Sequence, residues 1–238
     1  MRIILWDFDG TLATRDGMWG GALRDALLAC NSDLECELQD VRPFIMQRFP
    51  WHDWHSPHYD LDSSEKWWNH VFPLFRTAAK AFGFDDATAE HITIITKANF
   101  LNIEAWELAP GAQEVLETLK TSGWRNVITS NHVPELPEIV EGLGIAPYID
   151  DIFCSAHLGV EKPNPAFFQL VLDRLPRPHD AYVVGDNLNA DIGGARDANL
   201  PCVLVGQTHP TADASALTLR EVPALLESLA EKRTSERS

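Results

Sequence analysis

Short apolar segments alternate with helix-like segments along the second half of the chain, and this alternation constrains the fold more than any other feature. The apolar runs are continuous and short, as buried strands are, and glycine or polar residues separate them from the helices. We expect strands at 126–129, 149–155, 181–184 and 202–205, and helices at 110–122, 134–143, 165–175, 190–198 and 222–232. Such alternation favours a parallel sheet that is covered by helices on both faces.

The first half of the chain follows a different pattern. It starts with one more apolar run, Ile3 to Trp6, and then loses the strand-like segments. Four helices are expected there, at 19–29, 33–48, 63–82 and 85–100, with a capping box at Asp62 and Glu65 before the third. We therefore predict an α/β, Rossmann-like, doubly wound core formed by residues 1–14 and 106–232, an inserted α-helical cap domain at 15–105, and a polar tail at 233–238.

Polar side chains follow the expected strands, at the edge of the sheet where parallel α/β folds bind ligands. They are Asp7 with Asp9, Ser130 with Asn131, Lys162, and Asp186. Carboxylates that crowd one cleft repel each other, and a hard divalent cation such as Mg²⁺ relieves that repulsion. A serine hydroxyl and a lysine ammonium group suit a phosphate. Asp191 fits a metal site and the start of a helix about equally well.

Four motifs occur in a fixed order at these strand ends: DFDGT at 7–11, ITSN at 128–131, EKPNP at 161–165 and GDNLNAD at 185–191. With them the chain resembles the haloacid dehalogenase-like superfamily of hydrolases, in its phosphatase branch with a helical first-type cap. The resemblance covers residues 1–14 and 106–210. It implies a Mg²⁺-dependent phosphatase that hydrolyses a small phosphorylated metabolite through an aspartyl-phosphate intermediate.

The resemblance also implies a role for each residue of the motifs. Asp7 is the implied nucleophile, and Asp9 the acid and base that protonates the leaving oxygen and then activates water. The implied metal ligands are the Asp7 carboxylate, the Asp9 backbone carbonyl and Asp186, with Asp191 acting indirectly or through a water. Ser130 and Lys162 are the implied phosphate-binding residues, and Asn131 supports their loop.

Other activities of the same superfamily, and a non-catalytic role, make different demands on these positions. A phosphosugar mutase of the same superfamily shares both aspartates, and the sequence does not separate it from a phosphatase. Haloacid dehalogenases lack an aspartate at the position of Asp9. A phosphonoacetaldehyde hydrolase needs a Schiff-base lysine from the cap and a non-acidic residue at position 9. A non-catalytic binding module predicts a damaged site, whereas every chemical position here holds a competent residue.

Substrate specificity is expected to lie in the cap. The segment PWHDWHSPHYD at 50–60 is rich in tryptophan and histidine, but its prolines disfavour one helix that would present the histidines to a metal ion. An aromatic lid over the leaving group and simple packing within the cap both remain open. Our candidates for substrate contact are Trp19, His52 and His55, together with His132, which is close in sequence to Ser130.

The net charge, the hydropathy and the cysteine spacing of the chain disfavour several classes of binding partner and of metal site. With 19 basic and 35 acidic residues the chain carries a charge of −16, which disfavours nucleic acids and anionic membranes. No apolar stretch approaches the roughly 20 residues of a membrane span, no signal-peptide pattern is visible, and the four cysteines form no CxxC or zinc pattern. We expect a cytoplasmic protein, either a monomer or a homodimer.

Overall fold

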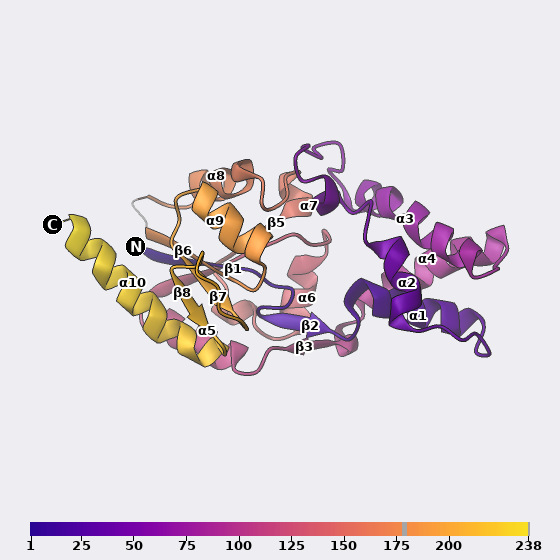
Figure 1. Ribbon diagram of the computed structural model, residues 1–238, viewed down its shortest axis with the longest axis horizontal. Coiled ribbons are helices and arrows are strands. Elements are labelled where there is room, and N and C mark those ends of the chain that lie inside the picture. The colour runs from indigo at the N-terminus through magenta and orange to yellow at the C-terminus, as the bar shows by residue number, and fades with distance from the viewer. Residues whose placement is uncertain (178–179, 238) are drawn as a thin grey trace.

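A six-stranded sheet of entirely parallel strands forms the centre of the computed structural model, which describes residues 1–177 and 180–237 (Figure 1). The order is β5-β4-β1-β6-β7-β8, with bounds β1 Arg2–Trp6, β4 Trp124–Ser130, β5 Asp151–Cys154, β6 Asp180–Gly185, β7 Cys202–Val205 and β8 Ala214–Ala216. The predicted α/β doubly wound fold is confirmed. The sequence did not predict β8, because its small residues form no apolar run.

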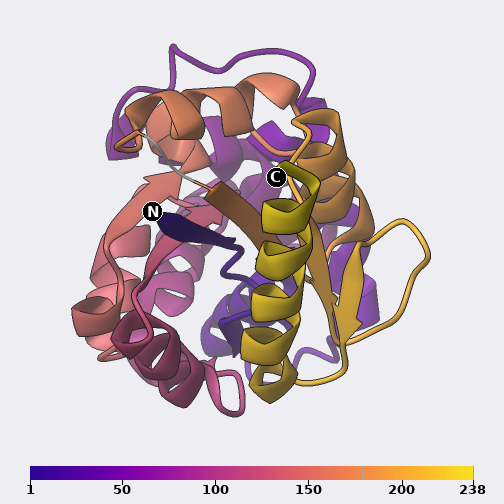
Figure 2. The ribbon, with the colours of Figure 1, turned by 90° about the vertical axis from the view of Figure 1, so that its left-hand side faces the viewer.

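Alternating residues of each central strand face two separate hydrophobic layers. In β1, Ile4 and Trp6 point into one layer, while Ile3 and Leu5 point into the other. The first layer is covered by α5 (Ala112–Thr121), α6 (Leu136–Gly142) and α10 (Val222–Arg237), and the second by α7 (Ser155–Leu158), α8 (Pro165–Arg174), η4 (Leu188–Gly193) and α9 (Gly194–Asp197). Figure 2 shows these helices around the sheet. The short η3 (Ala146–Tyr148) and η5 (Leu219–Glu221) complete this part.

Asn126 is a buried polar residue inside β4, and its amide is fully used. Its Oδ1 accepts from Trp6 Nε1 at 3.0 Å, and its Nδ2 donates to the carbonyls of Leu116 and Tyr148 at 2.9 and 3.1 Å. A buried amide is tolerated when its bonds are satisfied in this way. Asn126 therefore ties β1, α5 and the segment before β5 together beneath the strand ends.

A group of helices lies beside the sheet, at the end where β1, β4 and β6 finish (Figure 1). It consists of α1 (Met18–Cys30), α2 (Leu38–Ile45), η1 (Pro50–Asp53), α3 (Ser64–Ala81), α4 (Asp86–Leu101) and η2 (Ile103–Ala105). The antiparallel pair β2 (Ala13–Arg15) and β3 (Trp106–Leu108) connects it to the sheet. We propose that the boundary between core and cap runs through this pair, where the sequence predicts it.

One helix of this group is shorter than predicted, and another has a different capping residue. The helix predicted at 33–48 is shorter because Glu37 and Asp40 form a capping box, in which the Glu37 N–H donates to Asp40 Oδ2 at 2.9 Å. The predicted capping box at Asp62 is wrong by one residue: Ser63 caps α3 by accepting from the Lys66 N–H, and Asp62 pairs with the Lys66 ammonium group instead.

Two later helices also differ from prediction. The helix expected at 190–198 begins earlier as the π-helical turn η4, because Asn187 Oδ1 accepts from the backbone N–H groups of Asn189 and Ala190. Helix α10 continues to Arg237, through most of the predicted polar tail, and hydroxyls such as that of Ser235 bond to carbonyls one turn back. Ser238 lies outside the described residues.

The state of the cysteines and the character of the helices agree with what the sequence predicts. All four cysteines are free, and Cys154 and Cys202 are buried in strands, as predicted. Among residues 1–177 and 180–237, none of the helices combines the length and the apolar character that crossing a membrane requires.

Candidate active site

The candidate site lies at the carboxyl ends of three neighbouring strands, β4, β1 and β6. Strand β1 is the middle one, and the chain connections run from it to both sides of the sheet. Trp6 pairs with Ile128 of β4 and with Val184 of β6, so that the next residue, Asp7, emerges between the two neighbours. The Asp7 N–H donates to the Val184 carbonyl at 2.8 Å and fixes the backbone there. Ser130 ends β4, and Asp186 follows β6 directly. This is the place where open parallel sheets bind ligands.

Asp7 is almost buried, with 7% of its surface exposed, and donors surround its carboxylate. Lys162 Nζ donates to Asp7 Oδ1 at 2.7 Å, and Ser130 Oγ donates to the same oxygen at 3.2 Å. Thr11 Oγ1 lies 3.3 Å from Asp7 Oδ2 and also 3.3 Å from an oxygen of Asp186, so its one proton serves one of them at a time. The charge of Asp7 is thus held by an ammonium group and two hydroxyls.

Lys162 is shared between two carboxylates in a fully buried position. Besides Asp7 it donates to Asp191 Oδ1 at 2.5 Å, and the other oxygen of Asp191 accepts from the Asn187 N–H at 3.0 Å. Burial alone would lower the pKa of Lys162, but Asp191 and Asp7 outweigh it and raise that pKa. Burial, with a contribution from Asp7, raises the pKa of Asp191 to about 7, although Lys162 opposes the shift. The ammonium group therefore stays charged, while the site carries more negative charge than it can balance.

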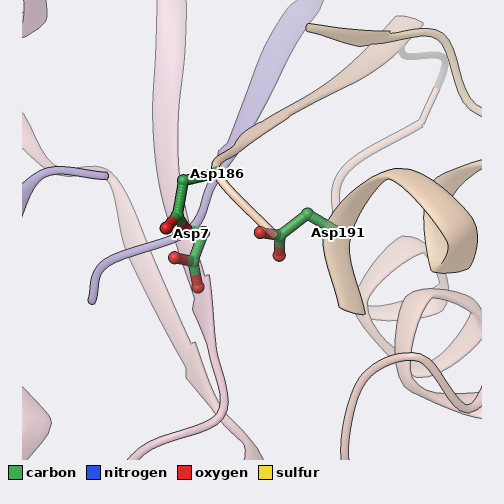
Figure 3. Close-up of side chains that lie close together, drawn as sticks. All are labelled: Asp7, Asp186 and Asp191. Carbon is green, nitrogen blue, oxygen red and sulfur yellow. The ribbon is translucent and has the colours of Figure 1, made fainter. Parts of the chain in front are cut away.

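Asp186 adds a third carboxylate to this cluster. Burial and the charge of Asp7 raise its pKa to about 6. Its approach depends on Gly10, which has a φ of 85° and where a Cβ would lie only 2.6 Å from Asp186 Oδ2. Oxygens of Asp7, Asp186 and Asp191 all lie within 4.8 Å of one another (Figure 3).

The oxygen cluster fits a hard divalent cation such as Mg²⁺. Its donors are carboxylate oxygens, the type that Mg²⁺ prefers, and burial together with the charge of Asp7 raises the pKa values of Asp186 and Asp191, which a bound cation would offset. Both oxygens of Asp191 are already engaged by Lys162 and Asn187. Asp7 and Asp186 are therefore the better placed to bind the ion directly, and Asp191 the better placed to orient Lys162.

Asp9 lies apart from the cluster, with 24% of its side chain exposed. Its Oδ1 is 3.3 Å from His132 Nε2, yet the two do not meet in hydrogen-bond geometry. Asp9 Oδ1 therefore has no hydrogen-bond partner among the described residues. The Asp7 carboxylate is thus held by one ammonium group and two hydroxyls, whereas the Asp9 side chain lines the cavity and makes no hydrogen bond through its buried Oδ1 to any described residue.

His132 is buried behind Asp9. It is 1% exposed and packs among the rings of Phe8, Phe100 and Trp106, whose centroids lie 5.6 to 5.7 Å away. Its two ring nitrogens have no hydrogen-bond partner within residues 1–177 and 180–237. The structure thus places His132 beside the acid/base candidate and not on the surface that a substrate would touch.

A cavity of about 240 Å³ opens above these residues. It is lined by the carboxylates and Lys162, by Ser130, Asn131, Asn187 and Ala190, and by the rings of Trp19 and Trp51. Asn131 joins its loop to that of Lys162 through two 2.8 Å bonds, one donated to the Lys162 carbonyl and one accepted from the Lys162 N–H. The seven motif residues predicted from the sequence are therefore brought together.

The predicted specificity residues are brought together only in part. Trp19 lines the cavity, whereas His52 lines a separate cavity of about 430 Å³ with His58 and His70. His55 is exposed and lies against Trp54, with ring centroids 3.5 Å apart. Four residues of the site were not singled out by the sequence analysis: Trp51, which lies in the segment 50–60, Thr11, which lies in DFDGT, and Asn187 and Ala190, which lie in GDNLNAD.

Comparison with known proteins places these features in a family. The model of the haloacid dehalogenase-like hydrolases matches residues 1–199. The chain is 30% identical over 212 residues to the human haloacid dehalogenase-like hydrolase domain-containing protein 3, covering 86% of this chain and 82% of that protein. It is 39% identical over 104 residues to a ribulose-1,5-bisphosphate 5-phosphatase of Halopiger xanaduensis, a match that spans 43% of this chain and 44% of that protein.

A solved structure extends the likeness to the whole fold. The crystal structure of the HAD-hydrolase YfnB from Bacillus subtilis, bound to magnesium, superposes with a TM-score of 0.69 and covers 94% of this chain and 98% of its own. The two chains are 22% identical, so the likeness is one of fold.

Proposed function

The chain belongs to the haloacid dehalogenase-like hydrolases, and we propose that it is a Mg²⁺-dependent phosphatase of a small phosphomonoester. The predicted enzyme class, a hydrolase of phosphoric monoesters, is confirmed by the phosphatase among its relatives. The observation that carries the proposal is the environment of Asp7. Its carboxylate is held at 2.7 Å by Lys162 and at 3.2 Å by Ser130, at the floor of the cavity.

Asp7 is the proposed nucleophile. A carboxylate oxygen attacks phosphorus, the new Asp7–phosphate bond forms, and the bond from phosphorus to the leaving oxygen breaks. Lys162 and Ser130 surround the same point, so that they meet the oxygens of the transferring group with donors that are already in place. Water then attacks the aspartyl-phosphate, phosphate leaves, and the Asp7 carboxylate is restored.

Asp9 is the proposed acid and base. In the first step it gives a proton to the leaving oxygen, and in the second it takes one from the attacking water. Asp9 suits this exchange because it lines the cavity beside Asp7 and keeps 24% of its side chain exposed. His132 lies behind Asp9, with its Nε2 3.3 Å from Asp9 Oδ1.

Mg²⁺ is the proposed cofactor, held by Asp7, Asp186 and the backbone carbonyl of Asp9, with Asp191 acting indirectly. When bound, it supplies positive charge that offsets the crowded carboxylates and the charge of the phosphate. Within the chain, Gly10 lets Asp186 approach Asp7, and Gly185 lets Asp191 approach Lys162, since a Cβ at Gly185 would lie 2.3 Å from Asp191 Oδ2.

Release of p-nitrophenol from p-nitrophenyl phosphate tests the proposal. We expect turnover with Mg²⁺ present, loss of turnover with excess chelator, and recovery when Mg²⁺ is restored. The reaction should need no bisphosphate activator, which a phosphosugar mutase would require. An absence of metal-dependent release from well-folded protein would rule out the phosphatase.

Mg²⁺ should stabilise the protein more strongly at high pH. The pKa values of Asp186 and Asp191 are raised from 3.8 to about 6 and about 7, so the folded state binds more protons than the unfolded state in this window. The metal-free protein therefore loses stability as pH rises from about 4 to about 7, and it regains it when a cation replaces those protons. At 100 times its Kd, Mg²⁺ should add about 2.7 kcal/mol.

Thermal unfolding at pH 5.5 and pH 8, with and without Mg²⁺, measures this difference. The increase in Tm on adding Mg²⁺ should be larger at pH 8, and Asp186→Asn should remove most of it. An equal increase at both pH values, or an increase that survives in Asp186→Asn, would contradict the assigned site.

The proposed substrate is a small phosphorylated metabolite, in keeping with the size of the cavity. The cytoplasmic setting and the monomeric or homodimeric state stay predictions. The four free thiols accord with a reducing compartment.

A further inference from the structure

We infer that this enzyme selects phosphomonoesters whose leaving group is small, carries no second anionic group and packs an apolar or aryl face against the indole rings of Trp19 and Trp51. The inference rests on the proposed phosphatase function and names the substrate class of the same site. Three features carry it: a preformed aromatic wall, the charge of the cavity, and its size.

The aromatic wall is built from rings that fix one another. Trp19 stacks on Phe100 with centroids 3.7 Å apart and planes within 9°. Trp51 stacks on Phe49 at 4.7 Å and 4°. The two tryptophans lie 6.3 Å apart at 40° to each other, and both line the cavity with the catalytic aspartates. Because the rings are already packed, binding a flat or apolar group against them costs little conformational entropy.

The segment that carries Trp51 is fastened to the loop that carries Lys162. The Asn164 side chain donates to the Trp54 carbonyl at 3.0 Å, and the His58 N–H donates to the Gly159 carbonyl at 2.7 Å. A third contact joins His58 Nδ1 to Glu161 Oε2 at 2.8 Å. Trp51 is therefore held at the cavity by contacts of its segment with the loop that carries Lys162.

The charge of the cavity opposes a second anion. Four carboxylates line it, and Lys162 is the only basic side chain that does so among residues 1–177 and 180–237. Lys162 is already paired with Asp7 and Asp191. When Asp9 carries the proton that it gives in the first step, Lys162 and a divalent cation only offset the other three carboxylates, and the substrate's own phosphate then makes the occupied site negative. A carboxylate or second phosphate on the leaving group would therefore meet repulsion and find no cation to pair with.

The volume of the cavity favours a small leaving group. Its volume of about 240 Å³ must hold the phosphate as well as the leaving group. Pockets for drug-sized ligands are larger, roughly 300–1,000 Å³. Because the cavity is partly open to solvent, this volume favours a leaving group of about one ring or a short chain over a bulkier one.

Two matched pairs of esters test the inference: phenyl phosphate against 4-carboxyphenyl phosphate, and n-propyl phosphate against phosphoglycolate. In both pairs the charged member carries one carboxylate that its partner lacks, and in the second pair the leaving groups are also nearly equal in size. With Mg²⁺ at pH 8, kcat/KM should be at least about tenfold higher for the uncharged member of each pair. Equal values, or a preference for the charged member, would overturn the inference and leave the phosphatase intact. No hydrolysis of any of the four would instead refute the proposed function.

Variants at Trp51 separate its role from general cap packing. Trp51→Ala should lower kcat/KM for phenyl phosphate about 3- to 10-fold, mainly through KM, and should leave the value for phosphoglycolate nearly unchanged. The matched control is Trp54→Ala, which removes an indole from the same segment but outside the cavity lining. It should keep the selectivity of the unmodified enzyme.

A gain of function completes the test. Trp51→Arg should raise kcat/KM for 4-carboxyphenyl phosphate about tenfold relative to phenyl phosphate, because it supplies the missing cation. If Trp51→Ala does not fold, Trp51→Phe and the four-ester panel still decide the question. A Trp51→Ala variant that loses both members of a pair equally, or a Trp54→Ala variant that changes selectivity as much as Trp51→Ala, would overturn the assignment.

Discussion

Asp7→Asn should reduce phosphatase turnover by about 10⁴-fold or more, because an amide cannot form the aspartyl-phosphate bond. Asparagine has nearly the same shape as aspartate, and its carbonyl oxygen can still accept from Lys162 and Ser130, so the site should remain assembled. The effect is expected on kcat for every substrate. It follows from the placement of Asp7 at the cavity floor, where a cation and hydroxyls already surround one oxygen.

Two measurements isolate the chemical role of Asp7. Mass spectrometry of rapidly quenched protein should detect a phosphorylated Asp7 in the unmodified enzyme and none in Asp7→Asn. Thermal unfolding of metal-free protein should show the variant to be at least as stable, because one of three crowded carboxylates is gone. The matched control is Asp33→Asn at an exposed position. Turnover in Asp7→Asn within tenfold of the original enzyme would refute the nucleophile.

The strand ends could be predicted from the sequence because two local signals coincide there. An apolar run such as Ile3 to Trp6 specifies a buried strand, and the polar residues after it mark the edge where parallel strands bind ligands. The position of the site could therefore be predicted from the order of strands and helices alone, without knowing where the side chains point. Strand β8 lacked the first signal, since Ala214–Ala216 is short and weakly apolar.

The wall of the cavity could not be predicted in the same way. Trp51 and His52 are adjacent in sequence, yet the first lines the active-site cavity and the second lines a different one. Which ring turns inward is decided by tertiary packing, here the stacking of Trp51 on Phe49. His132 illustrates the reverse case, because it is close to Ser130 in sequence but packs behind Asp9 among aromatic rings.

Lys162→Met should lower both turnover and stability. Methionine fills a similar volume but leaves the buried carboxylates of Asp7 and Asp191 without their ammonium group. Removing one partner of a buried ion pair costs about 3–5 kcal/mol, and removing one preorganised donor costs about 10²- to 10³-fold in kcat. The exposed pair of Lys66 with Asp62 provides the control, since Lys66→Met should leave the unfolding free energy nearly unchanged.

The stability loss in Lys162→Met should depend on pH. Without Lys162, the pKa of Asp191 should rise further above its present value of about 7, because the group that opposed the shift is gone. At pH 5.5 the folded variant can protonate Asp191 and recover part of its stability, while at pH 8 it must bury the charge. Denaturant unfolding at both pH values should therefore give the larger loss at pH 8. A loss that is equal at both would show that packing, not charge, is what Lys162 contributes.

A double variant separates the structural role of Lys162 from its proposed catalytic role. Lys162→Met combined with Asp191→Asn removes the ammonium group together with one of the carboxylates that it neutralises, so most of the stability lost at pH 8 should return. Turnover should not return, because the phosphoryl group still lacks its cation. If stability and turnover recovered together, the only role of Lys162 would be to neutralise the buried carboxylates. Another group would then have to stabilise the transferring phosphoryl group.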